Sequence, residues 1–297
     1  MMTAILLLLV PLWPLLLAIL TVVSHRRRLG GLLSLCGALP ALAVSIMAPL
    51  PGETSYAWLL LGTRLGLGEA DAIILLFTAI VWLLASIFAR TWVRERRERF
   101  FAFFLLTMSG NFGALVAQDI PSFYACFALM SFATYGLVAH KLSRDAKHAA
   151  NVYIVLVMIG EAALAAALML GAGAVGASDF VSVRAGLETA PLGQLIVALA
   201  FLGFGIKAGV LFLHVWLPLA HPVAPAPARA VLSGTVIVTG LVGWLRVLPV
   251  GEWALPGGGG ACIVLGLGAA FYGAFVGIDQ RNPKVVLAYS SISQMGI

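Results

Sequence analysis

The chain has 297 residues, of which 62% are hydrophobic and only 10% are charged, and its mean hydropathy is +1.05. Soluble globular domains carry about 25% charged residues, so this composition excludes that class and indicates an integral membrane protein. The formal net charge of +6 is distributed over alternate loops, which argues for membrane topology and against a nucleic-acid-binding surface.

Apolar stretches of about 18 or more residues recur along the whole chain, and each is long enough to cross a hydrocarbon core about 30 Å thick as a helix. The fold class we predict is therefore all-α, a polytopic transmembrane bundle of about ten helices. The expected helices cover residues 3–23, 31–50, 71–90, 100–118, 122–140, 151–172, 193–217, 228–247 and 259–278, and a tenth begins near Val285. The first is expected to be a membrane helix and not a signal peptide, because its basic residues follow the apolar run.

Basic residues collect in alternate loops. By the positive-inside rule these loops are cytoplasmic, and the N-terminus lies on the non-cytoplasmic side of what we expect to be a bacterial cytoplasmic membrane. No linker or change in composition divides the chain, so we expect a single transmembrane domain over residues 1–297. The basic residues that carry this topology are Arg26, Arg27, Arg28, Arg90, Arg94, Arg96, Arg97, Arg99, Lys141, Arg144, Lys147, Arg229, Arg281 and Lys284.

Signatures of metal, cofactor or catalytic sites are absent from the sequence. The three cysteines, Cys36, Cys126 and Cys262, fall in predicted helices and do not form a metal-type spacing. No glycine-rich phosphate loop and no Ser/His/Asp motif is present. The sequence therefore indicates no metal site and no catalytic residue in this chain.

Two ionisable residues, Glu161 and Lys207, fall near the middle of predicted membrane helices. Each costs about 2.5–3.5 kcal/mol at the bilayer centre on insertion scales, so both are expected to face the bundle interior or a hydrated cavity. Opposite charges on consecutive helices favour an ion path, in which the distance between them sets the proton affinity of the lysine. The alternative is a buried pair that fixes helix packing.

Histidines and helix breakers surround Lys207. His214 follows about two helical turns later and is a candidate proton relay, or else a packing histidine. Pro218 is expected to end the Lys207 helix, and nearby glycines favour either a local break or close helix packing. His221 is expected in a loop or at the interface because the surrounding prolines oppose a regular helix, although it remains a possible relay residue.

Two motifs carry a resemblance to a known family: "GFGIKAGVLFLHVWLPLAHPVAPAPARAVLSGTVIV" and "NPKVVLAYSSISQMGI". They resemble the antiporter-like proton-translocating membrane subunits of the superfamily of complex I, multi-subunit sodium/proton antiporters and membrane-bound hydrogenases, and they look closest to the formate hydrogenlyase branch. The resemblance implies that Lys207 is the central lysine of a proton channel, set in a broken helix and modulated by a glutamate. It also implies that iron–sulfur clusters and other redox cofactors reside in partner subunits.

The sequence departs from the family pattern at three places. Ala128 stands where the family carries its fifth-helix glutamate, and Glu161 in the next helix is the candidate replacement. Ser233 or Val238 stands where the family carries a second lysine or histidine, and Ser233, Thr235 and Thr239 can line a hydrated path without titrating. The resemblance implies N-terminal helices over 1–99, a five-helix inverted repeat over 100–247 and the start of a second repeat over 259–297. That second repeat is expected to be truncated at Ile297.

The function we expect is that of a proton-translocating, non-redox membrane subunit of a NADH:quinone oxidoreductase-like or hydrogenase complex. Its partners are then the other membrane and peripheral subunits, the lipid bilayer, and protons, with sodium as the alternative ion. One rival is a subunit of a sodium/proton antiporter or inorganic-carbon uptake system. Another is a non-conducting structural scaffold.

Overall fold

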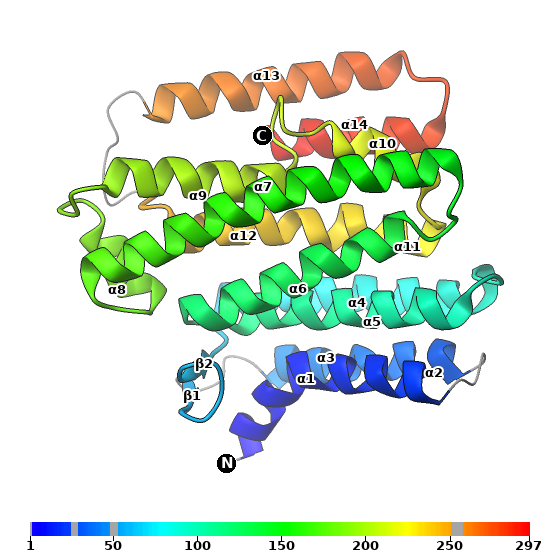
Figure 1. Cartoon of the computed structure of the whole chain (residues 1–297), viewed down its shortest axis with the longest axis horizontal. Coiled ribbons are helices and arrows are strands. Elements are labelled where there is room, and N and C mark those ends of the chain that lie inside the picture. Colours follow the sequence, from blue (N-terminus) through cyan, green and yellow to red (C-terminus); the bar gives the residue numbers. More distant parts are fainter. Residues whose placement is uncertain (1, 25–28, 48–52, 251–257) are drawn as a thin grey trace. The chain divides into compact units, whose positions relative to one another are not determined.

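The computed structural model describes residues 2–24, 29–47, 53–250 and 258–297 (Figure 1). Within these residues, eight helical segments are long and apolar enough to cross a membrane. A shorter apolar helix covers Gly193–Ala208. The predicted all-α class is therefore confirmed, and the spans cover Thr3–Val23, Leu29–Met47, Glu69–Trp92, Arg97–Val116, Ile120–Val138, Arg144–Val175, Ala226–Val247 and Gly258–Ile278.

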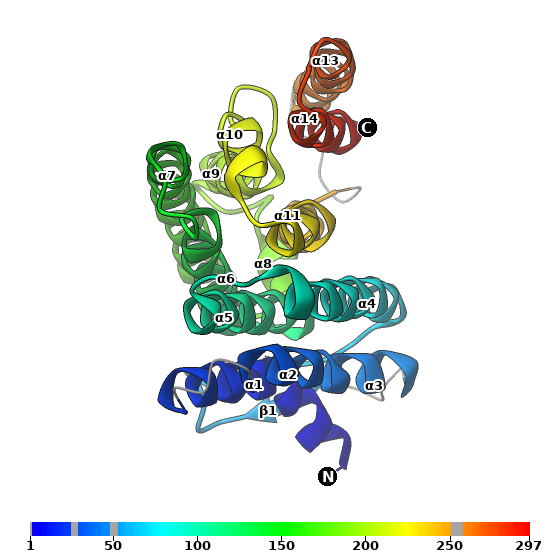
Figure 2. The same ribbon diagram turned by 90° about the vertical axis from the view of Figure 1, so that its right-hand side faces the viewer.

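The chain forms two compact units, of which the first comprises Met1–Lys141 and Pro225–Thr235. Its helices are α1 (Met2–Val23), α2 (Leu29–Gly37), α3 (Leu39–Met47), α4 (Glu69–Trp92), α5 (Arg97–Val116), α6 (Ile120–Val138) and α11 (Ala226–Val231). Figure 2 shows α1, α2 and α3 in one layer and α4, α5 and α6 in the next.

The interior of the first unit holds packed aromatic side chains, one of which hydrogen-bonds a buried amide. The Trp82 ring packs edge-to-face on Phe104, with 4.8 Å between the ring centroids. Its indole N–H donates to Oδ1 of Asn111 over 2.7 Å, so the buried amide oxygen is satisfied by protein. This hydrogen bond ties α4 to α5 at a place where both side chains are fully buried.

A short hairpin between α3 and α4 was not predicted. Strand β1 (Thr54–Tyr56) pairs antiparallel with β2 (Thr63–Leu65). Asp119 caps α6 by accepting from the backbone N–H of Ser122 over 2.9 Å. The other oxygen of this carboxylate accepts from the backbone N–H of Arg64 over 2.6 Å. One buried carboxylate therefore fastens the hairpin to the end of a membrane helix.

The second unit comprises Leu142–Ala224 and Val236–Ile297. Its helices are α7 (Arg144–Val175), α8 (Phe180–Gly186), α9 (Gly193–Ala208), α10 (Trp216–Val223), α12 (Ile237–Val247), α13 (Gly258–Ile278) and α14 (Pro283–Met295). Between α11 and α12 the chain forms a π-helical turn, η1 (Leu232–Val236). Helix α9 packs against both α7 and α12, and α13 packs against α14; α7 and α9 run beside each other in Figure 1.

The expected continuous helix over 193–217 is wrong, because the chain breaks earlier. Helix α9 ends at Ala208, and Gly209 adopts a left-handed conformation with φ +77° that glycine accepts without strain. The prediction that Pro218 ends this helix is also wrong, since Pro218 lies in the first turn of α10. A proline there costs little because first-turn N–H groups have no helical acceptor.

Candidate functional site

The break after α9 is closed by hydrogen bonds from the protein itself. The backbone N–H groups of Gly209 and Val210 both donate to the carbonyl of Gly205, over 2.9 and 3.0 Å. The carbonyl of Ile206 accepts from the indole N–H of Trp216 over 2.8 Å. Broken helices are tolerated at membrane depth only where such partners exist, so the sequence of this segment supports a stable interruption.

Lys207 lies in the last turn of α9, directly before the break. Its side chain is only 3% exposed. A cation is favoured at the C-terminal end of a helix, where carbonyl groups carry partial negative charge. The interruption therefore provides part of the electrostatic stabilisation that an ammonium group needs inside a membrane.

Tyr153, on α7, is the direct partner of Lys207. The lysine Nζ donates to the phenol oxygen over 3.1 Å and lies 5.6 Å from the centroid of the same ring. The Tyr153 ring packs edge-to-face on Trp216 at 5.1 Å and an interplanar angle of 64°. Lysine, phenol and indole thus form one buried cluster that joins α7, α9 and α10.

Glu161 lies on α7 directly after Gly160, a glycine that faces Gly203 of α9. Its side chain is 5% exposed, and its charge acts on the Lys207 ammonium by Coulomb attraction. A methyl group added at Gly203 would lie 2.8 Å from the carbonyl oxygen of Gly160. The two glycines therefore allow the backbones of α7 and α9 to approach each other. The buried acid lies on one of these helices and the buried lysine on the other.

His214 does not follow Lys207 on one helix face, because residues 209–215 are not helical. The helical spacing on which its predicted position depends is therefore absent. The imidazole is 8% exposed and packs edge-to-face on Tyr272 of α13, with centroids 5.2 Å apart. The Tyr272 ring in turn lies 6.0 Å from that of Tyr289 on α14. His214 thus connects the interrupted segment to the α13–α14 pair.

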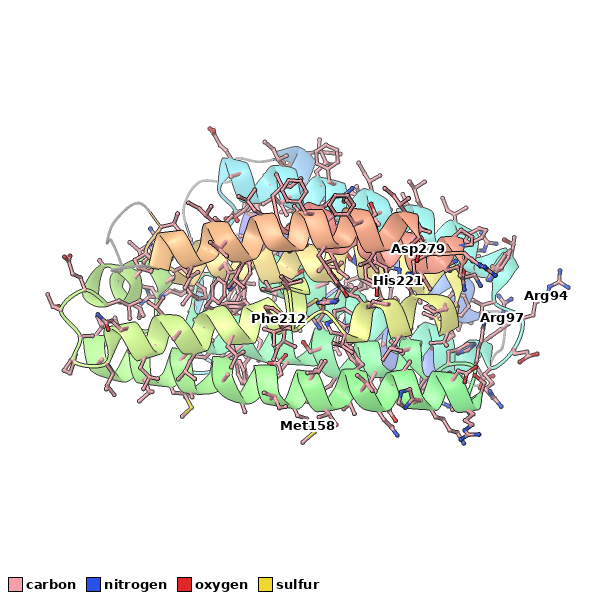
Figure 3. The ribbon with its side chains drawn as sticks, turned by 90° about the horizontal axis from the view of Figure 1, so that it is seen from above. Arg94, Arg97, Met158, Phe212, His221 and Asp279 are labelled. Carbon is pink, nitrogen blue, oxygen red and sulfur yellow. The ribbon has the colours of Figure 1, made fainter. Side chains whose placement is uncertain are left out.

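His221 is fully buried inside α10, so the expectation of a loop or interfacial position is wrong. Helix α10 continues to Val223 even though it contains Pro222. Figure 3 shows His221 among the helices of the second unit, whereas the 59% exposed Met158 points away from α7. Treating every proline here as a helix breaker caused the error.

The hydroxyl-bearing residues after α10 belong to different units. Ser233 and Thr235 lie in η1 and in the first unit, whereas Thr239 lies in α12 and in the second unit, as Lys207 does. Thr235 donates to the carbonyl of Val231 over 2.8 Å, the usual local bond of a helical threonine.

Ala128 lies in α6 of the first unit. Among the described residues, no three His, Cys, Asp or Glu side chains cluster in a way that suits a metal ion.

Sequence reasoning missed Tyr153 and Trp216. The signal for Tyr153 is its position on the same buried stripe of α7 as Val157, Gly160 and Glu161, at spacings of three and four residues. Trp216 carried no comparable signal, because its role depends on a carbonyl that only the helix break leaves free.

Comparison with known proteins identifies a family and several relatives. Residues 117–297 match the family described as "NADH:quinone oxidoreductase/Mrp antiporter, TM". The chain is similar to hydrogenase-4 component B of Escherichia coli, with 30% identity over 241 residues that cover 78% of this chain and 36% of that protein. It is also similar to NAD(P)H-quinone oxidoreductase chain 4 2 of Microcystis aeruginosa, with 32% identity over 218 residues, 69% of this chain and 38% of that one.

A solved structure shows the same fold over the whole chain. It is a chain of the Mrp complex from Dietzia sp. DQ12-45-1b, with a TM-score of 0.87 and 21% identity. The similarity covers 100% of this chain and 58% of that one. The present chain thus spans little more than a third of the length of the two curated relatives and over half of this structural neighbour.

Proposed function

The chain belongs to the NADH:quinone oxidoreductase/Mrp antiporter family of membrane subunits, and from this premise we propose that it translocates protons in a complex I-like or hydrogenase-type complex. The observation that carries the proposal is the buried Lys207 at the end of an interrupted helix. Lys207 is the proton carrier, Glu161 its modulator, and His214 a relay between the break and α13.

A lysine suits this task because its amine exchanges a proton readily once it is buried. A nearby carboxylate favours the charged form, and burial favours the neutral form. A movement that changes the distance between Glu161 and Lys207 therefore changes the proton affinity of the lysine. Such a movement, driven by a neighbouring subunit, supplies the coupling without any redox chemistry in this chain.

Redox chemistry is assigned to partner subunits, which would hold the iron–sulfur clusters and other cofactors. Two relatives, a hydrogenase component and a quinone oxidoreductase chain, support this assignment. We place the chain in a bacterial cytoplasmic membrane, and the alternation of basic loops supports an orientation with the N-terminus outside. Protons are the proposed ion, and sodium is the rival.

The first test of the proposal is the identity of the partners. The protein is isolated from its native membrane in mild detergent, and the co-purifying subunits are identified by mass spectrometry. We expect hydrogenase or quinone oxidoreductase subunits that bind redox cofactors. Recovery of antiporter or carbon-uptake subunits alone would instead support the rival transporter function, which the similarity to the Mrp complex favours.

Glu161→Gln is expected to reduce proton translocation about tenfold, which is about 1.4 kcal/mol of coupling at 25 °C. Glutamine keeps the size and hydrogen-bonding capacity of the side chain but removes the charge that acts on Lys207. The measurement is proton flux in vesicles that contain the intact complex, normalised to the amount of assembled complex.

The matched control for this variant is Glu188→Gln, which removes an exposed acid from the same unit. Its flux should equal that of the unaltered protein. Equal fluxes in Glu161→Gln and Glu188→Gln would show that Glu161 does not modulate the carrier.

A further inference from the structure

We propose that Tyr153 is a positioning residue for Lys207: its phenol oxygen holds the amine in one position, and the Glu161 carboxylate attracts it toward a second. The inference rests on the proposed function of Lys207 and specifies how that site is controlled. It assigns a role to a side chain in which sequence analysis found no function.

The first position is defined by a rigid cluster. Tyr153 has no exposed surface and Trp216 has 1%, and the two rings pack at 5.1 Å. The indole is held by the carbonyl of Ile206, one residue before Lys207. The phenol that receives the amine at 3.1 Å is therefore packed against the helix break itself, and a change at the break alters where the phenol oxygen lies.

The second position of the amine is beside Glu161, which lies on α7 as Tyr153 does. A methyl group at Gly171 would lie 3.6 Å from the Ile196 side chain, and one at Gly160 would lie 3.4 Å from that of Ile206. Helices α7 and α9 are thus antiparallel. This alignment places the backbone of Lys207 at a level between Tyr153 and Glu161. Tyr153 and Glu161 are eight residues apart on α7, or about 12 Å at 1.5 Å per residue.

The two groups select different forms of the amine. A phenol both donates and accepts hydrogen bonds, so it can bind the neutral amine as well as the ammonium. A carboxylate attracts the ammonium far more strongly than the neutral amine. A flexible four-carbon stem lets the amine move between the two. Protonation thus favours movement toward Glu161, and deprotonation favours return to Tyr153, so the location of the amine is linked to its proton.

Other titratable groups near the site do not lie on this stripe of α7. His214 is in the turn after α9 and packs on Tyr272, and His221 is inside α10. The ionisable residue of α12, Arg246, lies 6.0 Å from the Phe180 ring of α8. The experiment therefore tests whether Tyr153 and Glu161 compete for the amine of Lys207.

The experiment is a double-mutant cycle of Tyr153→Phe and Glu161→Gln in the intact complex. Phenylalanine keeps the ring that packs on Trp216 and removes only the hydroxyl. Proton flux across vesicles is followed with a pH-sensitive dye and normalised to complex that retains its partner subunits. Tyr135→Phe is the matched control, since it removes a hydroxyl from α6 of the other unit.

We expect Tyr153→Phe to lower flux about tenfold and Tyr135→Phe to leave it unchanged. Because the two groups compete for one amine, the double variant should retain about the flux of either single variant. If the two residues had independent structural roles, their tenfold losses of flux would multiply, and the double variant would lose about 100-fold. Such a loss, or normal flux in Tyr153→Phe, would overturn the inference. If Lys207→Met still translocates protons normally, the proposed function itself fails, which keeps the two failures distinguishable.

Discussion

Lys207→Met is expected to abolish proton translocation by the intact complex while leaving its assembly unchanged. Methionine is unbranched and of similar length, and it carries neither charge nor exchangeable proton, so it fits the buried site beside Tyr153 and Trp216. Loss of a positioned proton-transfer group costs about two orders of magnitude or more in rate. The measurement is proton flux in vesicles, with the partner subunits quantified in the same preparation.

The matched control is Lys147→Met, which removes an exposed lysine from the first turns of α7. This variant removes one positive charge from the same unit but leaves the buried cluster of Lys207, Tyr153 and Trp216 intact. Its proton flux should therefore be normal. Undiminished translocation in an assembled Lys207→Met complex would refute the role assigned to the lysine and would favour the scaffold function.

Gly203→Ala is expected to destabilise the second unit and to reduce proton flux about tenfold. The added methyl group would lie 2.8 Å from the carbonyl oxygen of Gly160 and 3.1 Å from the backbone nitrogen of Leu164. Backbone atoms of a packed helix cannot move aside as a flexible side chain does. The two helices must separate, and overpacking of this kind typically costs about 1–3 kcal/mol.

The consequence for flux follows from the position of the contact. Glu161 directly follows Gly160 on α7, and Lys207 lies one turn beyond Gly203 on α9. Separating the backbones here weakens the attraction between the acid and the lysine. Thermal unfolding in detergent and proton flux should therefore fall together in this variant.

Gly173→Ala on α7 is the matched control for Gly203→Ala. A methyl group there meets no atom within 4 Å, and alanine is the better helix former by about 1 kcal/mol. The control should be as stable as the unaltered protein or slightly more so, with normal flux. Unchanged stability and flux in Gly203→Ala would show that the close approach of α7 and α9 has no role in the site.

Several features could be predicted because they depend on residue type and spacing alone. Runs of apolar residues predicted the spans, and the described helices begin or end within a few residues of the expected bounds for most of them. The burial of Glu161 and Lys207 also followed from the cost of a charge in lipid. The hairpin at Thr54–Leu65 could not be predicted, because its short strands depend on Asp119 more than fifty residues away.

The break in α9 shows why local patterns were insufficient near the site. Proline was expected to end the helix, yet Gly209 ends it nine residues before Pro218. Helix propensity indicated only that glycine lowers the helical stability of the segment around Gly209. Whether a weak segment breaks depends on what satisfies the freed backbone groups, and here Trp216 does so for Ile206. That partner is recognisable only after the chain has turned back on itself.

The amino-acid sequence by itself determined that this chain is a helical membrane protein with a buried acid and a buried lysine in two successive apolar stretches. Hydropathy and the cost of desolvating a charge are properties of the residues and need no tertiary contact. Only the tertiary structure decided that α7 and α9 approach through Gly160 and Gly203, and that Lys207 meets Tyr153. Those contacts join residues more than forty positions apart, and they exist only because antiparallel packing brings two helix faces into register.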